Sequence, residues 1–362
     1  MLELNGEYTK AKIIVDDPGY ESVQQIRHLC DLDVLANSKI RVMGDICPAI
    51  GATIGCTLTY DENVLPSLVG SDIGCGIVTV RLDAGRIDPQ HLERVIRDNV
   101  SGRKRIDAIL SKHQENIDLR ELLCAKKVDI GRCYDKLGEL GGGNHFIELD
   151  RDSSGNYWLT IHSGSRLLGQ QIYDYYIDLG DQHNTRIFSS LSGELKEQYL
   201  HDAEIAESFA HESRMTIIDI VCKFLKTKPV EEYHSVHNYI DTANRIIRKG
   251  AISAATGEKV VIPISASPVY GGVIIGRGKG NEEWNLSAPH GAGRICSRAE
   301  SKNLFTVSEF KREMDGVYSS GINAAGLTEA PMVYKRREYI RESIGELVDI
   351  DDILIPVYNF KN

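Results

Sequence analysis

The sequence lacks the long apolar runs and the targeting segment that would place the protein in a membrane or outside the cell. None of its uninterrupted apolar segments approaches the roughly 20 residues that are needed to span a bilayer. Its start, Met1–Gly6, has neither the basic residues nor the apolar run of a signal peptide. These absences predict a soluble, cytoplasmic protein without a membrane partner.

Cysteine is sparse and irregularly spaced. The 362 residues include eight cysteines, and none of them form a CxxC pair. In a cytosolic chain of this size, such thiols are mostly reduced and serve as small core residues. Cys75 is the exception, because it lies between two glycines and close to Asp72, where it could act as a metal ligand.

Positive charge is in deficit as well. The chain has 42 lysines and arginines against 52 aspartates and glutamates, which gives a formal net charge of −10. This balance argues against a protein coated in basic surface for nonspecific nucleic-acid binding. A local basic groove is still compatible with it, because recognition depends on where the charges lie.

No repeat, low-complexity tract or clear linker divides the chain, and its 42% hydrophobic residues suffice for a large core. Runs of strand pattern are mixed with scattered helical patterns, which predicts a single α+β domain over residues 1–362. The predicted strands are 10–15, parts of 40–61, 76–82, 146–149, 157–162, 259–264, 272–276 and 353–358. The predicted helices are 22–31, 89–100, 191–225 and two stretches within 307–346.

Four glycine-punctuated segments or strand ends carry nearly all the candidate metal ligands. These candidates are Asp72, Cys75, His145, His162 and His237. A carboxylate, a thiol and several imidazoles could converge on a divalent site with mixed oxygen, sulfur and nitrogen ligands. A thiolate and a carboxylate so close in sequence could also bridge two metals. The alternative for any single member is a hydrogen-bonded structural histidine or a buried thiol.

The other histidines have no glycine neighbours, or lie outside these turns. We interpret His28, His91, His113, His183, His201 and His211 as solvated or structural. His234 is three residues before His237, so it could support the site from behind the direct ligands.

A second pair of segments combines glycine with basic residues around one histidine. Ser287–Arg294 contains His290, and Gly276–Asn281 precedes it closely. Glycine lets a backbone approach a ligand, and arginine and lysine suit a phosphate. The histidine could bind a metal, shuttle a proton or attack phosphorus. We expect Arg277, Lys279 and Arg294 to line a phosphate path; the alternative is a glycine-rich turn with a solvated basic face.

Taken together and in order, these motifs resemble the RtcB family of RNA ligases. The resemblance runs from about Arg41 to the C-terminus. It rests on DIGCG at 72–76, GGGNHFIE at 141–148, HSGSR at 162–166, HN at 237–238, RGKGN at 277–281 and HGAGR at 290–294.

The resemblance implies a large domain of mixed β-sheets flanked by helices. It implies a GTP- and Mn²⁺-dependent ligase that joins an RNA 3′-phosphate or 2′,3′-cyclic phosphate to a 5′-hydroxyl. His290 falls on the histidine that takes GMP covalently, and the five candidate ligands fall on positions that hold two Mn²⁺ ions per site. The nucleotide positions are Asn144, Glu148, His290, Gly291, Ala292, Gly293 and Lys361. Arg166 matches an arginine linked to RNA or phosphate binding.

The chain departs from the family pattern at several places. It is shorter than typical members, Cys47 replaces a histidine, and Ile264, Ser265 and Ala266 fall in an altered segment. The final glycine is Asn362. Since the nucleophile and all five metal positions are present, we expect the guanylylation chemistry to persist. We expect the RNA substrate to differ, with RNA repair favoured over tRNA splicing.

Two other functions are compatible with the same residues. A metal-dependent phosphodiesterase or phosphatase would use the metals to activate water, with His290 as general acid or base. A non-catalytic relative would use the site to dock on RNA. The sequence names neither the RNA substrate nor a helper protein.

Overall fold

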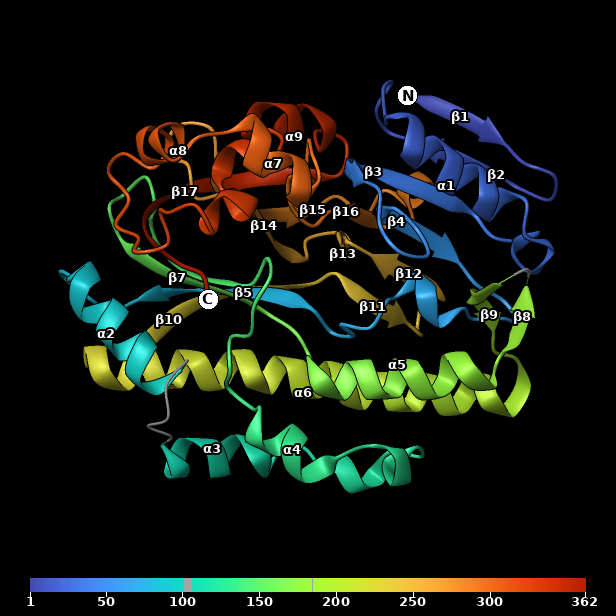
Figure 1. The fold of residues 1–362 in the computed structure, drawn as a ribbon, viewed down its shortest axis with the longest axis horizontal. Coiled ribbons are helices and arrows are strands. Elements are labelled where there is room, and N and C mark those ends of the chain that lie inside the picture. Colours follow the sequence, from blue (N-terminus) through green and yellow to red (C-terminus); the bar gives the residue numbers. More distant parts are fainter. Residues whose placement is uncertain (101–105, 184) are drawn as a thin grey trace.

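The computed structural model describes residues 1–100, 106–183 and 185–362. Two large β-sheets form its upper layer, and a layer of long helices lies beneath them (Figure 1). The predicted α+β class, with mixed sheets flanked by helices, is therefore confirmed. Within the described residues no helix combines the length and apolar character that crossing a membrane requires.

The first sheet contains the N-terminal strands. Its order is β1 (Leu2–Asn5), β2 (Lys10–Ile13), β3 (Ile40–Cys47), β4 (Ile54–Thr59), β12 (Ile246–Lys249) and β11 (Asn238–Asp241). Strands β2 and β3 are parallel, which requires the crossover through helix α1 (Tyr20–Cys30).

The second sheet carries most of the candidate site residues. Its order is β10 (Pro229–Val236), β5 (Gly76–Leu82), β7 (Tyr157–Ser163), β6 (Phe146–Arg151), β17 (Val348–Phe360), β15 (Gly272–Gly278) and β14 (Lys259–Ser265). Neighbouring strands in this sheet are antiparallel. Two short ribbons complete the β-structure, β13 (Ala251–Ser253) with β16 (Ser287–Pro289) and β8 (Asp181–His183) with β9 (Thr185–Ser190).

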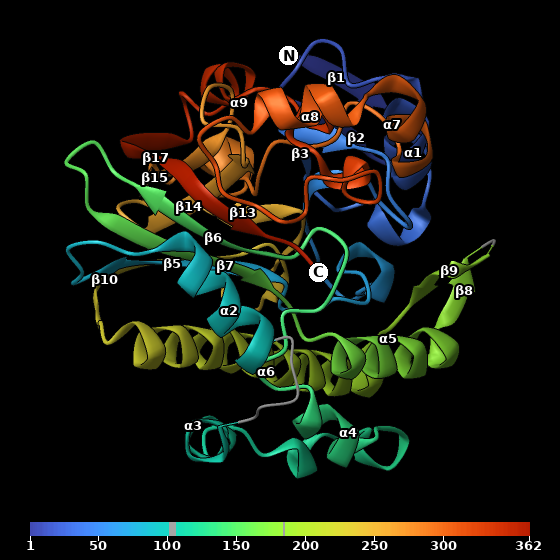
Figure 2. The same cartoon turned by 60° about the vertical axis from the view of Figure 1, so that its left-hand side comes forward.

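The helices divide between the two sides of the sheets (Figures 1 and 2). Below them lie α5 (Leu167–Leu179) and α6 (Gly193–Leu225), with α3 (Asp107–Gln114) and α4 (Ile130–Asp135) lower still. Helix α2 (Pro89–Asn99) lies at one end, and α7 (Arg298–Leu304), α8 (Val307–Glu313) and α9 (Arg337–Ser343) lie above.

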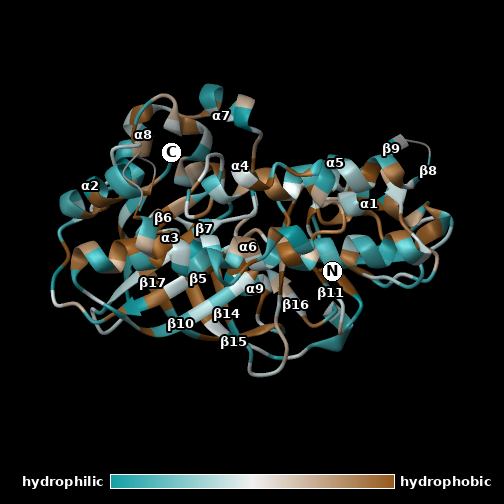
Figure 3. Cartoon of the chain, turned by 90° about the horizontal axis from the view of Figure 1, so that it is seen from below, coloured by the Kyte–Doolittle hydropathy of each residue, from teal (hydrophilic) through white to brown (hydrophobic). Residues whose placement is uncertain are grey.

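Helix α6 connects the two halves of the core. Phe209 packs with the cluster under the first sheet, whereas Ile217 packs with the cluster under the second. From below, α5 and α6 show alternating hydrophilic and hydrophobic stretches, as expected for helices with one buried face (Figure 3). One rigid element thus underlies both sheets where they meet.

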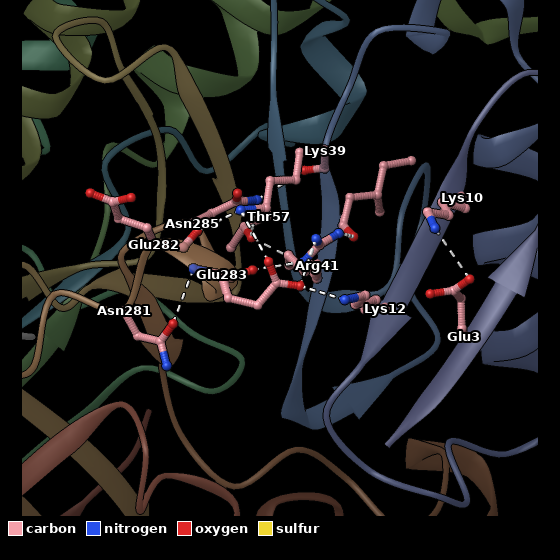
Figure 4. A network of polar contacts seen from close by, with 11 residues as sticks. Glu3, Lys10, Lys12, Lys39, Arg41, Thr57, Asn281, Glu282, Glu283 and Asn285 are labelled. Carbon is pink, nitrogen blue, oxygen red and sulfur yellow. Dashed lines mark hydrogen bonds and ion pairs between the residues drawn. The ribbon is translucent and has the colours of Figure 1, made fainter.

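A polar network fastens the N-terminal sheet to the segment that leads to His290 (Figure 4). The Glu283 carboxylate lies 2.7 Å from Lys12 Nζ, 3.0 Å from Arg41 Nη2 and 3.6 Å from Lys39 Nζ. Arg41 Nε also donates to the Glu283 carbonyl, at 2.7 Å. Cations from β2 and β3 therefore meet on one acidic side chain from another part of the chain.

Candidate active site

The candidate metal ligands lie at one end of four neighbouring strands. In the register, Gly76 faces Ser163 and Val236, and Phe146 faces His162. The residues that adjoin these positions are therefore brought together from distant parts of the sequence. All five candidates, Asp72, Cys75, His145, His162 and His237, meet there.

The contacts among the five form a continuous chain of donor atoms. Asp72 Oδ2 lies 3.1 Å from His145 Nε2, and Cys75 Sγ lies 3.4 Å from both His145 Nε2 and His162 Nε2. His162 Nε2 is in turn 3.3 Å from His237 Nε2. The donors divide into two triads, Asp72–Cys75–His145 and Cys75–His162–His237, and Cys75 belongs to both.

This donor set fits a pair of divalent cations that share one thiolate. Within each triad the ligand atoms lie within 4.8 Å of one another. Burial, together with the charges of nearby histidines, lowers the pKa values of His162 and His237, so both imidazoles are neutral and free to ligate. Burial would raise the pKa of Asp72, but hydrogen bonding and the charge of His145 lower it, so this carboxylate is ionised. Burial and the charge of Asp72 raise the pKa of Cys75, a cost that a bound cation would offset.

His145 and Asp72 are oriented by backbone groups. His145 Nδ1 lies 3.0 Å from the Leu140 carbonyl, which leaves Nε2 directed at the cluster. The N–H of Arg166 donates to Asp72 Oδ1, at 3.0 Å. Arg166 adopts a positive φ of 58°, a conformation that is costly for a residue other than glycine. Its side chain lies against Gly141, where an added Cβ would be 2.2 Å from Cζ. The strain therefore occurs directly beside the candidate ligands.

His290 lies next to this cluster, with its ring 4.6 Å from that of His237. Its Nδ1 is 2.6 Å from Asp45 Oδ2, and its backbone N–H donates to the same oxygen at 3.0 Å. Asp45 is fully buried at the end of β3. A buried carboxylate on Nδ1 selects the tautomer with Nε2 unprotonated, so Nε2 is the nitrogen available for chemistry.

Sequence reasoning did not single out Asp45. The sequence carries two signals for it: an acidic residue within the buried strand β3, and a position two residues before Cys47, in the segment where the chain departs from the family pattern. A further cation holds the same segment: Lys335 Nζ donates to the carbonyls of Gly44 and Ile46, at 3.0 and 2.9 Å.

A cavity of about 430 Å³ opens beside His290. All the predicted nucleotide-binding residues line it, namely Asn144, Glu148, His290, Gly291, Ala292, Gly293 and Lys361. The departures from the family pattern line it too, namely Cys47, Ile264, Ser265 and Ala266. The structure thus places this cavity, lined by both apolar and polar residues, against the metal-ligand candidates, with His290 between the two.

The inner end of the cavity carries a perturbed carboxylate. Burial raises the pKa of Glu148 to about 7, and its Oε2 accepts a 2.7 Å hydrogen bond from Asn359 Nδ2. Burial and the neighbouring Glu148 raise the pKa of Asp150 well above its usual range. Burial also lowers the pKa of Lys361, although Glu329 and Glu148 oppose that shift. Such perturbed groups in a cavity are typical of functional sites.

The three residues predicted to line a phosphate path, Arg277, Lys279 and Arg294, do not all lie in the same place. Arg294 lines the cavity, and its Nη2 is buried with no hydrogen-bond partner among the described residues. Arg277 and Lys279 lie outside the cavity lining on β15 and its following turn, where they pair with Asp351 and Asp349 of β17, at 3.5 and 3.0 Å. Arg298, which sequence reasoning passed over, lines the cavity and pairs with Glu329 at 2.8 Å.

The remaining histidines lie away from the cluster of donor atoms. His113 is buried between Glu212 and Asp219, with ring nitrogens 2.5 and 3.1 Å from their carboxylates, which is a structural role. His234 Nε2 lies 3.2 Å from Arg214 Nη2, behind the turn that carries Cys75. Its predicted supporting position is thus compatible with the contacts.

Known proteins are similar in sequence to this chain over most of its length. The family described as tRNA-splicing ligase RtcB matches residues 25–123 and 93–362. The RNA-splicing ligase RtcB of Escherichia coli K12 is 30% identical over 358 residues, which cover 86% of this chain and 87% of that protein. The RNA-splicing ligase RtcB2 of E. coli ATCC 25922 is 26% identical, covering 95% and 92%. The tRNA-splicing ligase RtcB of Archaeoglobus fulgidus is 24% identical, covering 91% and 89%.

Proposed function

Because the chain belongs to the RtcB family of RNA-splicing ligases, we propose that it is a GTP-dependent RNA ligase acting through a histidine–GMP intermediate. It joins an RNA 3′-phosphate or 2′,3′-cyclic phosphate end to a 5′-hydroxyl end. One observation carries the proposal: His290, held by the buried Asp45, lies between the five-donor cluster and the 430 Å³ cavity.

Two Mn²⁺ ions are the metals that this proposal assigns to the cluster. Asp72, Cys75 and His145 would hold one, and Cys75, His162 and His237 the other. Bound there, the ions would neutralise the charge that develops on the phosphoryl oxygens during transfer. A thiolate favours Zn²⁺ over Mn²⁺, so the assignment of Mn²⁺ rests on the family resemblance.

His290 is the proposed nucleophile. Its Nε2 forms a bond to the α-phosphorus of GTP, and the bond from that phosphorus to the bridging oxygen breaks, so pyrophosphate leaves. The carboxylate of Asp45 keeps the Nδ1 proton in place and stabilises the positive charge on the ring. An RNA 3′-phosphate oxygen then attacks the GMP phosphorus and breaks the P–N bond. Finally, the RNA 5′-hydroxyl attacks the activated 3′-phosphate and releases GMP.

The cavity is the proposed nucleotide site. Glu148, at its buried end, is suited to accept hydrogen bonds from the N–H groups of a guanine, and Asn144, Lys361 and the Gly291–Gly293 backbone provide further polar contacts. Arg166 and Arg294 are the proposed RNA or phosphate contacts. For Arg277 and Lys279, which pair with β17, contact with RNA stays a prediction, as does a cytoplasmic location.

The RNA substrate is proposed to belong to repair in preference to tRNA splicing. Four positions that depart from the family pattern, Cys47, Ile264, Ser265 and Ala266, line the cavity beside His290.

The proposal is tested by incubating the protein with α-labelled GTP and Mn²⁺, followed by denaturing electrophoresis. We expect a protein-bound label that is acid-labile and alkali-stable, as a phosphoramidate is, and that disappears in His290→Ala while bound manganese stays near the wild-type level. If manganese binds and no label forms, the phosphodiesterase or docking alternative is favoured. Loss of both label and metal in His290→Ala would make His290 a metal ligand instead.

A further inference from the structure

A buried cation lies behind the metal-ligand candidates, on the side formed by α6. Helix α6 packs directly against their turn, since an added Cβ at Gly74 would lie 2.6 Å from the Cα of Glu207. Two turns further along the same helix lies Arg214, which is fully buried. Burial lowers the pKa of its guanidinium only to about 10, so it is charged at neutral pH.

Arg214 contacts both segments that carry the shared ligands of the cluster. Its Nη1 donates to the carbonyls of Gly74 and Ser163, at 2.9 and 2.8 Å. Gly74 immediately precedes Cys75, and Ser163 immediately follows His162. A single nitrogen atom of Arg214 thus fixes the distance between the backbone segments that carry Cys75 and His162. The Nη2 group meanwhile lies 3.2 Å from His234 Nε2.

The charge of Arg214 is not balanced by a direct ion pair. Among the described residues, no carboxylate oxygen lies within 4.0 Å of its nitrogens, and its Nε is buried with no hydrogen-bond partner. A buried charge without an ion pair is costly, and a purely structural role would be met at lower cost by an apolar side chain. Compensation comes at longer range from Cys75 and Asp72 of the cluster and from Glu207 of α6, which all interact electrostatically with Arg214.

We infer that Arg214 is a positioning residue for the metal pair: it holds the Cys75 turn and the end of β7 at the spacing that two cations require, and its charge complements the shared thiolate. The inference rests on the proposed metal pair. It explains why a guanidinium, and not an ammonium, occupies the position, since the planar fork addresses two carbonyls and a histidine at once. It also explains the position of His234, whose Nε2 contacts Nη2 of Arg214 and so helps to orient the guanidinium.

Metal binding tests the inference without reference to ligase activity. The metal-free protein is titrated with Co²⁺, and the ultraviolet absorption band that a thiolate–cobalt bond produces is followed together with the stoichiometry. For the wild type we expect two ions per chain and a thiolate band. For Arg214→Lys we expect cobalt affinity about 10- to 100-fold weaker, the range typical when a residue that supports a ligand is lost, and a shifted or weakened band.

The matched control is Arg248→Lys. Arg248 is equally buried, but it holds the carbonyls of Asn285 and Leu286 and does not contact the Cys75 turn. We expect this variant to lose thermal stability to a similar degree while keeping wild-type cobalt affinity. Arg214→Lys keeps the charge and most of the volume of the side chain, so it tests the geometry of the guanidinium without removing the buried charge.

The outcomes separate the two proposals. If the wild type binds cobalt with a thiolate band and Arg214→Lys binds it equally tightly with the same band, the role of Arg214 is overturned and the metal pair stands. If Arg248→Lys loses cobalt to the same extent as Arg214→Lys, the effect is general destabilisation and the inference is wrong. If the wild type itself shows no thiolate band, the proposed metal pair fails, and the inference with it.

Discussion

At the scale of single residues, the contact between Asp45 and His290 is the one on which the proposed chemistry depends most. Asp45→Asn keeps the volume and one oxygen but removes the charge that selects the Nδ1–H tautomer of His290. We expect the rate of protein guanylylation to fall by at least about 100-fold, since the same change beside a catalytic histidine costs more than that in hydrolases. Rapid-quench labelling with α-labelled GTP measures this rate.

Metal content provides the control for that variant, because Asp45 contacts no residue of the five-donor cluster in the described structure. We expect Asp45→Asn to bind metal like the wild type. An unchanged labelling rate would show that His290 does not depend on this carboxylate, and the nucleophile would have to be sought elsewhere.

Glu148 gives the nucleotide site a pH dependence whose sign can be worked out. Burial raises its pKa to about 7, so the carboxylate is protonated below that pH and ionised above it. Only the ionised form can accept two hydrogen bonds from a guanine edge. GTP affinity should therefore increase with pH through 7, and weaken about fivefold between pH 7 and pH 6 as the ionised fraction falls.

Calorimetric titration of His290→Ala with GTP measures this affinity without turnover. The triphosphate titrates in the same range, so the control is the double variant that also carries Glu148→Gln, in which only the ligand's own titration remains. An identical pH profile in both proteins would remove Glu148 from guanine recognition.

The sequence could not reveal Asp45 or Arg214 as site residues, because each acts on a partner far along the chain. Asp45 and His290 are 245 positions apart, and Arg214 and Gly74 are 140 apart. Four of the candidate ligands, by contrast, could be found from the sequence, because each lies within a few residues of a glycine that indicates a tight turn. Arg277 and Lys279 also lie close to glycines, but they are not in the cavity lining. They pair with Asp351 and Asp349 of β17, and the sequence of β15 alone does not show which strand lies beside it.

At the scale of elements, prediction worked where the local pattern was strong. The strand at 76–82 is observed as β5 with the same bounds, and the helix predicted over 191–225 is α6, Gly193–Leu225. The start of the predicted helix 89–100 also agrees with α2, which Asp88 caps, since its side chain accepts from the N–H of Gln90. The final strand is longer than predicted, Val348–Phe360, because it pairs on both sides with β15 and β6.

Helix α5 is one of the elements that were not predicted, and its helical pattern is weakened by a packing requirement. Helix α5 contains Gly169, a poor helix residue, where an added Cβ would lie 2.6 Å from the Ser71 carbonyl. The glycine lets α5 approach the turn that carries Asp72. The same glycine that allows this close contact also weakens the helical pattern, so α5 is hard to predict from the sequence.

At the scale of the whole molecule, the site joins two sheets that the chain builds separately. Asp45 comes from the first sheet, and Glu148 and His162 come from the second. His237 lies in the one-residue connection between β10 and β11, which passes from one sheet to the other. The reacting groups can meet only if the sheets keep their relative position, so contacts remote from the cavity matter to it.

The Glu283 network is such a contact, and it yields a stability prediction. The cations around Glu283 lower its pKa to about 2, with the hydrogen bond from Lys12 as the largest cause. Because the folded-state pKa is depressed, the stabilisation is fully present above about pH 4.5 and is lost as the pH falls toward 2. Since Glu283 is half exposed, we expect Glu283→Gln to lower the free energy of unfolding at pH 7 by only about 1 kcal/mol.

Urea unfolding at pH 7 and at pH 3 tests this, because the difference in unfolding free energy between variant and wild type should shrink to less than about half at the lower pH. The control is Glu3→Gln, which removes a single exposed ion pair with Lys10, 3.4 Å long, in the same sheet. That variant should unfold within about 0.5 kcal/mol of the wild type at both pH values. If Glu283→Gln behaves like Glu3→Gln, the network does not fasten the two parts, and the buried contacts of β3 with β16 and α9 must hold Asp45 against His290 without it.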